Sequence, residues 1–212
     1  MAYSCAATGT EYLRTTPESL FSYPFTINCW FRLTTVSAQR NLVMLENAGN
    51  GQRFALFVNS SNQLVLVAVD GGGTTQTIIT SPTISSNIWY MATGVFTSST
   101  SRTVYLDGAN SITGTVSRSP TTPARVLMGG QYTGVATTSN LNGRIAEVGI
   151  WNIALGASDI ASLYNYAKPT SVRPDSLQIY YPLVREVYNL FGRDTVNTDG
   201  GTKGADHQRR YG

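Results

Sequence analysis

The chain has 212 residues, of which 42% are hydrophobic and only 13% charged, so it can build the core of one large domain beneath a polar but weakly charged surface. Its 15 Lys and Arg residues outnumber the 12 acidic ones, giving a net charge of +3, but they form no basic stripe with interleaved aromatics, which argues against nucleic-acid binding. No apolar run approaches the roughly 18 residues of a membrane span, and the start MAYSCAATGT lacks the basic and apolar regions of a secretion signal.

The first half of the chain contains the patterns of β-strands separated by Gly, Asn, Ser and Thr turns. PFTINCWFRL (24–33) is the clearest strand, because alternate residues from Phe25 to Leu33 are apolar and predict one face on the core, with Trp30 on the other face. Strands are also predicted over LVMLEN (42–47), RFALFVN (53–59) and QLVLVAV (63–69). The last of these is apolar on both faces, which indicates a central strand.

The second half continues the all-β pattern. After a Gly-rich reversal, TTQTIIT (74–80) is polar enough for an edge strand. IWYMATGVF (88–96) and RTVYLDG (102–108) predict a hairpin, in which Asp107-Gly108 marks the next reversal. Shorter strands are expected around 112–116 and 125–129.

The segment NGRIAEVGIWNIALGASDIASLYNY (142–166) changes from a strand pattern to a helix pattern. Its first half alternates, which predicts Ala146, Val148 and Ile150 on one face and Glu147 on the other. Further on, apolar positions from Ile160 to Ala167, including Leu163 and Tyr164, follow the spacing of one helix face, which predicts a short helix near residues 158–167. In this prediction Ser158 caps the helix, Asp159 suits its positive end, and Pro169 stops it.

Five motifs of the chain resemble laminin-G-like and pentraxin-like domains of the concanavalin A-like superfamily. They are GTEYLRT (9–15), FTINCWFRL (25–33), IWYMATGVF (88–96), VYLDG (104–108) and GRIAEVGIWNIAL (143–155). The resemblance implies an all-β fold, a two-sheet antiparallel jelly-roll sandwich with one short helix. Members of that superfamily bind glycans, mediate adhesion or, in some branches, hydrolyse glycosides.

After the helix, SLQIYYPLV (176–184) alternates again and is expected to close the sandwich beside residues 3–7 or 12–14. We therefore expect a sandwich domain over residues 1–184 and a C-terminal tail or arm over 185–212. The ending LFGRDTVNTDGGTKGADHQRRYG (190–212) resembles the tails of laminin-G-like phage virion proteins, although Gln208 and Arg209, not prolines, follow His207. Two hypotheses stay open for the tail: disorder, or an inter-subunit arm ending in Arg209, Arg210 and Tyr211.

The sequence carries no constellation typical of an enzyme. Glycoside hydrolysis needs two carboxylates roughly 5 to 10 Å apart, whereas Glu147 and Glu46 each stand alone on a predicted strand. The sole histidine, His207, lies in the tail, which disfavours a catalytic triad and a histidine metal site. No cofactor is expected; calcium is the one metal considered, but the Asp residues are too scattered to predict its oxygen cage.

The two cysteines, Cys5 and Cys29, are interpreted as buried thiols, with a disulfide between them as the alternative. Three aromatic residues are candidates for glycan or interface contacts: Trp30 on an outer strand face, Tyr132 in a Gly-rich loop and Trp151 at the end of its strand. The competing interpretation is packing in the core or in an interface.

The leading hypothesis from the sequence is a non-enzymatic virion structural protein, such as a phage capsid decoration protein, that is assembled in the host cytoplasm without a signal peptide and contacts a capsid or other virion protein. The alternative is a carbohydrate-binding, lectin-like module or adhesin that binds a surface glycan. Nearly all the basic residues are Arg, which suits interfacial pairing and favours a homo-oligomer. Neither nucleic-acid binding nor membrane insertion is expected.

Overall fold

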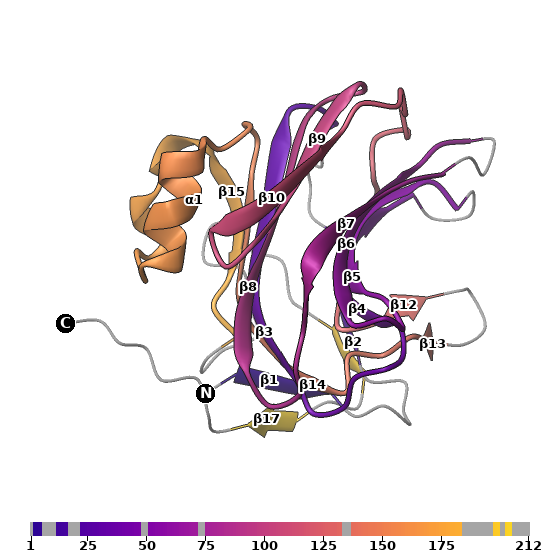
Figure 1. Ribbon diagram of the computed structural model, residues 1–212, viewed down its shortest axis with the longest axis vertical. Helices are drawn as coiled ribbons and strands as arrows, with labels where there is room; N and C mark the ends of the chain where they lie inside the picture. Colours follow the sequence, from indigo (N-terminus) through magenta and orange to yellow (C-terminus); the bar gives the residue numbers. More distant parts are fainter. Residues whose placement is uncertain are drawn as a thin grey trace.

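The computed structural model describes residues 2–5, 12–16, 22–47, 51–71, 75–132, 137–183, 197–199 and 202–204. Two antiparallel sheets pack face to face, and the short helix α1 (Ala157–Tyr164) lies outside one of them (Figure 1). The predicted jelly-roll sandwich with a helix near its end is therefore confirmed.

Sheet A, which carries the helix, runs in the order β10-β9-β8-β3-β14-β1-β17, with β15 also paired to β14. Its strands are β1 (Ala2–Cys5), β3 (Phe25–Leu33), β8 (Trp89–Ser98), β9 (Ser101–Leu106), β10 (Ala109–Gly114), β14 (Gly143–Trp151), β15 (Leu177–Tyr181) and β17 (Thr202–Gly204).

Sheet B runs in the order β16-β2-β11-β4-β5-β6-β7. Its strands are β2 (Tyr12–Thr15), β4 (Arg40–Glu46), β5 (Arg53–Val58), β6 (Gln63–Val69), β7 (Thr75–Thr83), β11 (Arg125–Met128) and β16 (Asn197–Asp199). A separate hairpin joins β12 (Gln131–Tyr132) to β13 (Thr137–Thr138), and two short 3-10 turns, η1 (Pro169–Ser171) and η2 (Pro174–Ser176), lead into β15.

The main core lies between the sheets, and β3 shows why. Its alternate residues Phe25, Ile27, Cys29, Phe31 and Leu33 all belong to the buried cluster between the sheets, as the alternation predicts. The β8–β9 hairpin and the Asp107-Gly108 reversal are also confirmed. β7 ends sheet B as expected, and β6 is buried on both faces but lies one strand from that edge instead of at the centre.

The predicted alternation of β14 is wrong, because the strand contains a β-bulge. Ala146 pairs with Trp30 and Gly149 with Asn28, so the three-residue step along β14 lies opposite a two-residue step along β3. The extra residue is Glu147, whose φ of 54° lies in the left-handed region. Ala146 therefore does not share the face of Val148 and Ile150.

The helix begins and ends differently from the prediction. Gly156, not Ser158, is the N-cap, and Asp159 accepts a hydrogen bond from its backbone N–H at 3.3 Å. The helix ends at Tyr164, five residues before Pro169. The chain leaves the helical conformation at Tyr166, with a φ of 66°, so a left-handed residue and not the proline stops the helix.

The predicted closing strand also pairs elsewhere. β15 pairs with β14 between Val148 and Trp151, while β1 pairs with the earlier part of the same edge, between Gly143 and Ile145. Of the predicted tail, residues 197–199 pair with β2 in sheet B and residues 202–204 with β1 in sheet A. The arm residues Arg209, Arg210 and Tyr211 lie outside the described residues.

Candidate functional site

Three aromatic rings gather on the outer face of sheet A, beside the end of α1. The indole of Trp30 is nearly parallel to the ring of Tyr164, with centroids 6.0 Å apart and planes at 9°, and to the ring of Tyr166, at 5.6 Å and 8°. Trp30 is only 8% exposed, whereas Tyr164 is 39% and Tyr166 43% exposed. We call these three residues the aromatic platform; its accessible surface belongs to the tyrosines.

The end of α1 determines where the two tyrosines lie. Ile160 and Leu163 bury one face of the helix against sheet A. The Tyr166 N–H donates to the Leu163 carbonyl at 3.2 Å, and the Ala167 N–H donates to the Ser162 carbonyl at 2.9 Å. These two bonds form a Schellman motif, whose left-handed position is usually occupied by glycine. Here Tyr166 occupies it, and its ring lies against Trp30.

The apolar surface continues from Trp30 toward the start of β8. Trp89 is half-buried and packs against Ala146, whose register partner on β3 is Trp30. The aromatic platform therefore continues into the half-buried Trp89 on this face.

Asp107 brings a carboxylate to the same place. The Met91 N–H donates to Asp107 Oδ1 at 2.7 Å, and the Asp107 N–H donates to the Met91 carbonyl at 2.9 Å. Met91 is the register partner of Trp30 on β8. The turn also contacts the helix, because a Cβ at Gly108 would lie 2.8 Å from Tyr164 Cβ.

The electrostatics fit this arrangement. Burial raises the pKa of Asp107, although the hydrogen bond from the Met91 N–H opposes that change. The Asp107 carboxylate in turn raises the pKa of Tyr164, with burial and Tyr166 adding to the effect. The Tyr164 hydroxyl therefore stays protonated at neutral pH and lies within the field of the Asp107 charge.

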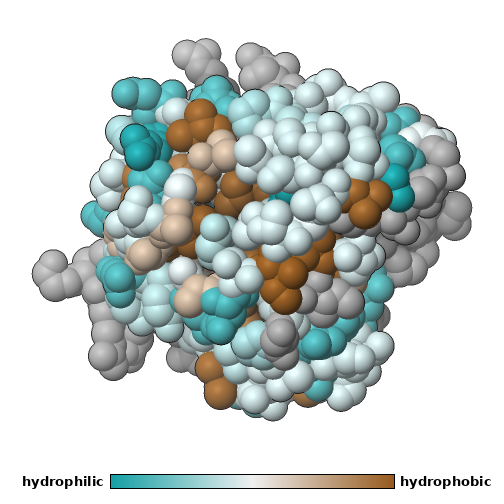
Figure 2. Space-filling view, turned by 45° about the horizontal axis from the view of Figure 1, so that its top comes forward, coloured by the Kyte–Doolittle hydropathy of each residue, from teal (hydrophilic) through white to brown (hydrophobic). Residues whose placement is uncertain are grey.

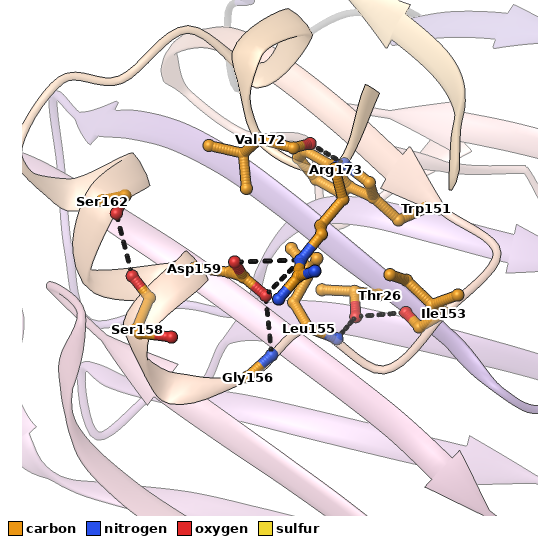
Figure 3. Close-up of polar contacts among 10 residues, drawn as sticks. All are labelled: Thr26, Trp151, Ile153, Leu155, Gly156, Ser158, Asp159, Ser162, Val172 and Arg173. Atoms are coloured by element: carbon orange, nitrogen blue, oxygen red, sulfur yellow. Dashed lines mark hydrogen bonds and ion pairs between the residues drawn. The ribbon is translucent and has the colours of Figure 1, made fainter. Parts of the chain in front are cut away.

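Of the two predicted contact residues whose side chains the structure describes, Trp30 belongs to this site and Trp151 does not. Trp151 points outward from β14 but is fully buried beneath the α1 region, and its indole N–H donates to the Val172 carbonyl at 2.8 Å (Figure 3). The chain that follows the strand covers Trp151, which fits the competing interpretation of packing in the core. The side chain of Tyr132 lies outside the described residues.

The helix covering Trp151 is fixed at its N-terminal end by polar contacts. Arg173 Nε lies 3.0 Å from Asp159 Oδ2, and Thr26 on β3 links to the loop before the helix by donating to the Ile153 carbonyl at 2.8 Å and accepting from the Leu155 N–H at 2.9 Å (Figure 3). These contacts position α1, and through it the two tyrosines at its other end.

The carboxylates considered for hydrolysis are engaged in structural contacts. Glu147 is buried, and its Oε2 accepts a hydrogen bond from the Tyr180 hydroxyl. Glu46 Oε1 lies 2.5 Å from Arg125 Nη2 in sheet B; burial raises the pKa of Glu46, and Arg125 opposes that change. Within the described ranges, no group of three or more His, Cys, Asp or Glu side chains could hold a metal ion.

Cys29 is a free, buried thiol, and burial raises its pKa. The disulfide alternative therefore does not occur at Cys29, because its side chain faces the core between the sheets.

On the face seen in Figure 2, most of the surface is pale, as expected for a surface rich in Ser and Thr, and apolar residues form a few separate patches. Among the described helices, none has the length and apolar character needed to span a membrane.

Among solved structures, the chain is similar to a putative carbohydrate binding protein from Bacteroides ovatus (TM-score 0.71, 16% identity, 95% of this chain and 58% of that chain covered). It is also similar to a native heptameric SAP-like pentraxin from Limulus polyphemus (TM-score 0.68, 15% identity, 99% and 96% covered). A third similar structure is the Ruminococcus gnavus IT-sialidase CBM40 bound to alpha2,3 sialyllactose (TM-score 0.60, 12% identity, 76% and 97% covered).

These identities are low, so the likeness to the solved structures concerns the fold alone. No curated protein matches the chain. The family model described as the concanavalin A-like lectin/glucanases superfamily, of laminin G type, matches residues 7–161. The chain therefore belongs to the concanavalin A-like lectin/glucanase superfamily.

Proposed function

We propose that this protein is a non-catalytic carbohydrate-binding module whose ligand packs on the aromatic platform of Trp30, Tyr164 and Tyr166. The observation that carries the proposal is Tyr166, a 43% exposed aromatic residue in the left-handed position of a Schellman motif. A non-glycine residue there is unfavourable for the backbone, and such strain is concentrated at functional sites. The ring placed by that conformation is parallel to Trp30.

The chemistry of the site suits a sugar. The apolar C–H face of a pyranose packs on flat aromatic rings, whose faces carry partial negative charge. The hydroxyls of Tyr164 and Tyr166 and the Asp107 carboxylate supply hydrogen-bonding groups that fix a ligand's orientation. The fold supports this class of function, since the similar solved structures include carbohydrate-binding proteins.

The test is a glycan array followed by calorimetry on any bound glycan. Replacing Tyr164 or Tyr166 with Ala should weaken binding about fivefold each, on the scale of an aromatic contact worth roughly 1 kcal/mol. Tyr164→Phe keeps the ring and should retain most of the affinity. Val116→Ala is the matched control, because Val116 is an exposed apolar residue just beyond β10, outside the platform. Absence of any glycan ligand, or full affinity in the folded double Ala variant, would refute the proposal.

The expected homo-oligomer would add avidity to single sites of modest affinity. Light scattering during size-exclusion chromatography measures the oligomer directly, and a strict monomer would remove this part of the proposal. The similar solved structures named above are two carbohydrate-binding proteins and a pentraxin, which favours the carbohydrate-binding alternative over the virion hypothesis.

A further inference from the structure

A fixed carboxylate borders the aromatic platform, and its position bears on the kind of sugar that can bind there. Asp107 Oδ1 is held by the Met91 N–H at 2.7 Å, and the Asp107-Gly108 turn rests against Tyr164. The hydrogen bond anchors the carboxylate without neutralising its charge. A sugar ring on Tyr164 would therefore meet an acceptor-only group at a fixed position.

Among the causes that raise the pKa of Tyr164, the charge of Asp107 is the largest, and the other charged groups nearby lie on several elements. Arg32, one outward position beyond Trp30 on β3, donates from Nε to the Asn87 carbonyl at 3.1 Å, and Arg144 is its register partner on β14. At the opposite end of α1, Arg173 is paired with Asp159 at 3.0 Å. Lys168 lies just after the helix, and the buried Glu147 accepts a hydrogen bond from the Tyr180 hydroxyl. The charge that acts most strongly on the Tyr164 hydroxyl is that of Asp107.

From this geometry we infer that the platform selects glycans by charge: the sugar that stacks on Tyr164 is neutral or aminated and donates a hydroxyl or amine hydrogen to Asp107, while acidic sugars are excluded. This inference rests on the proposed function and specifies its ligand class. The physical reason is that a sialic or uronic carboxylate would face a second carboxylate across a partly buried site, where repulsion is stronger than in bulk water. The sialyllactose seen on a protein of similar fold would thus be a poor ligand here.

The test uses an array that carries each core glycan in a neutral and an acidic form, such as lactose and 3′-sialyllactose, with Asp107→Asn as the variant. Asparagine keeps an oxygen acceptor for the Met91 N–H but removes the charge, so the turn should remain intact. We expect the native protein to bind neutral forms at least about tenfold more tightly than acidic forms, and the gap to close in Asp107→Asn and narrow at high salt.

Asp70→Asn is the matched control, because it removes a carboxylate directly after β6 in sheet B, whereas the platform lies on the outer face of sheet A, and it should leave the selectivity unchanged. Tighter binding of acidic forms by the native protein, or an unchanged gap in Asp107→Asn, would overturn the charge selection while leaving the platform proposal standing. Binding that survives loss of both tyrosines would instead overturn the platform, and the charge selection with it.

Discussion

Replacing Tyr166 separates the energetic role of its backbone from the role of its ring. In Tyr166→Ala the ring contact with Trp30 is lost, at about 0.5–1.5 kcal/mol, while the residue stays in the left-handed conformation with a φ of 66°. In Tyr166→Gly the same contact is lost, but the conformation no longer carries the penalty of roughly 1–2 kcal/mol for a residue with a Cβ. Glycine's greater conformational freedom in the unfolded chain offsets part of this stabilisation. We therefore expect Tyr166→Gly to be more stable than Tyr166→Ala by about 1 kcal/mol.

Urea unfolding followed by circular dichroism measures this difference, and glycan affinity should fall equally in both variants. The same pair of changes at Tyr164 is the control, because Tyr164 is the last helical residue and glycine there should be less stable than alanine by up to about 1 kcal/mol. Opposite signs at the two positions would support the proposed strain. If Ala is at least as stable as Gly at position 166, Tyr166 carries no such penalty and the argument from strain to function fails.

Three further predictions concern the scaffold. Trp151→Phe leaves the buried Val172 carbonyl without its donor and should cost about 2–4 kcal/mol in the free energy of unfolding, measured by urea unfolding; a loss below about 1 kcal/mol would contradict its buried role. Gly143→Ala should cost about 3 kcal/mol or prevent folding, since the new Cβ would lie 2.1 Å from the Arg32 carbonyl oxygen, and near-native stability would disprove that contact. Burial raises the pKa of Glu46, so this carboxyl binds more protons in the folded protein than in the unfolded chain. The free energy of unfolding should therefore fall as the pH rises from the unfolded pKa of about 4.3 through the folded pKa, by at most ~1.4 kcal/mol per pH unit. Urea unfolding at several pH values should show this contribution in the native protein and not in Glu46→Gln.

The sequence predicts the sandwich well wherever strands alternate without interruption. The face of β3 from Phe25 to Leu33 is an example, because each side chain has its expected direction. The prediction fails at Glu147 because a glutamate carries no local signal for a left-handed residue, unlike the Asp107-Gly108 turn. The end of α1 fails for the same reason: Pro169 is a visible stop, and Tyr166 is not.

The site is only partly predictable from the sequence. Alternation places Trp30 on the outer face of its strand, but it places Trp151 there too, and only the packing of the following chain shows that one is covered completely. The apolar spacing of the helix predicts Tyr164 on its buried face, whereas Tyr164 is 39% exposed. The sequence predicts Asp107 as a turn residue, but its nearness to Trp30 depends on the β3–β8 register, which the sequence does not reveal.

The bulge at Glu147 connects the sandwich to the platform. Without the extra residue, strict alternation from Ile145 in the core would turn Trp151 inward and the apolar Val148 toward the helix. With it, Val148 lies in the core and Trp151 faces outward, where Gly149 leaves room for the indole because a Cβ there would lie 2.6 Å from it. The α1 region packs on that indole, and the helix end carries Tyr164 and Tyr166 to Trp30. One inserted residue in an interior strand thus sets the position of a surface site two elements away, which explains why the strand-to-helix segment is informative about function although its own carboxylate is buried.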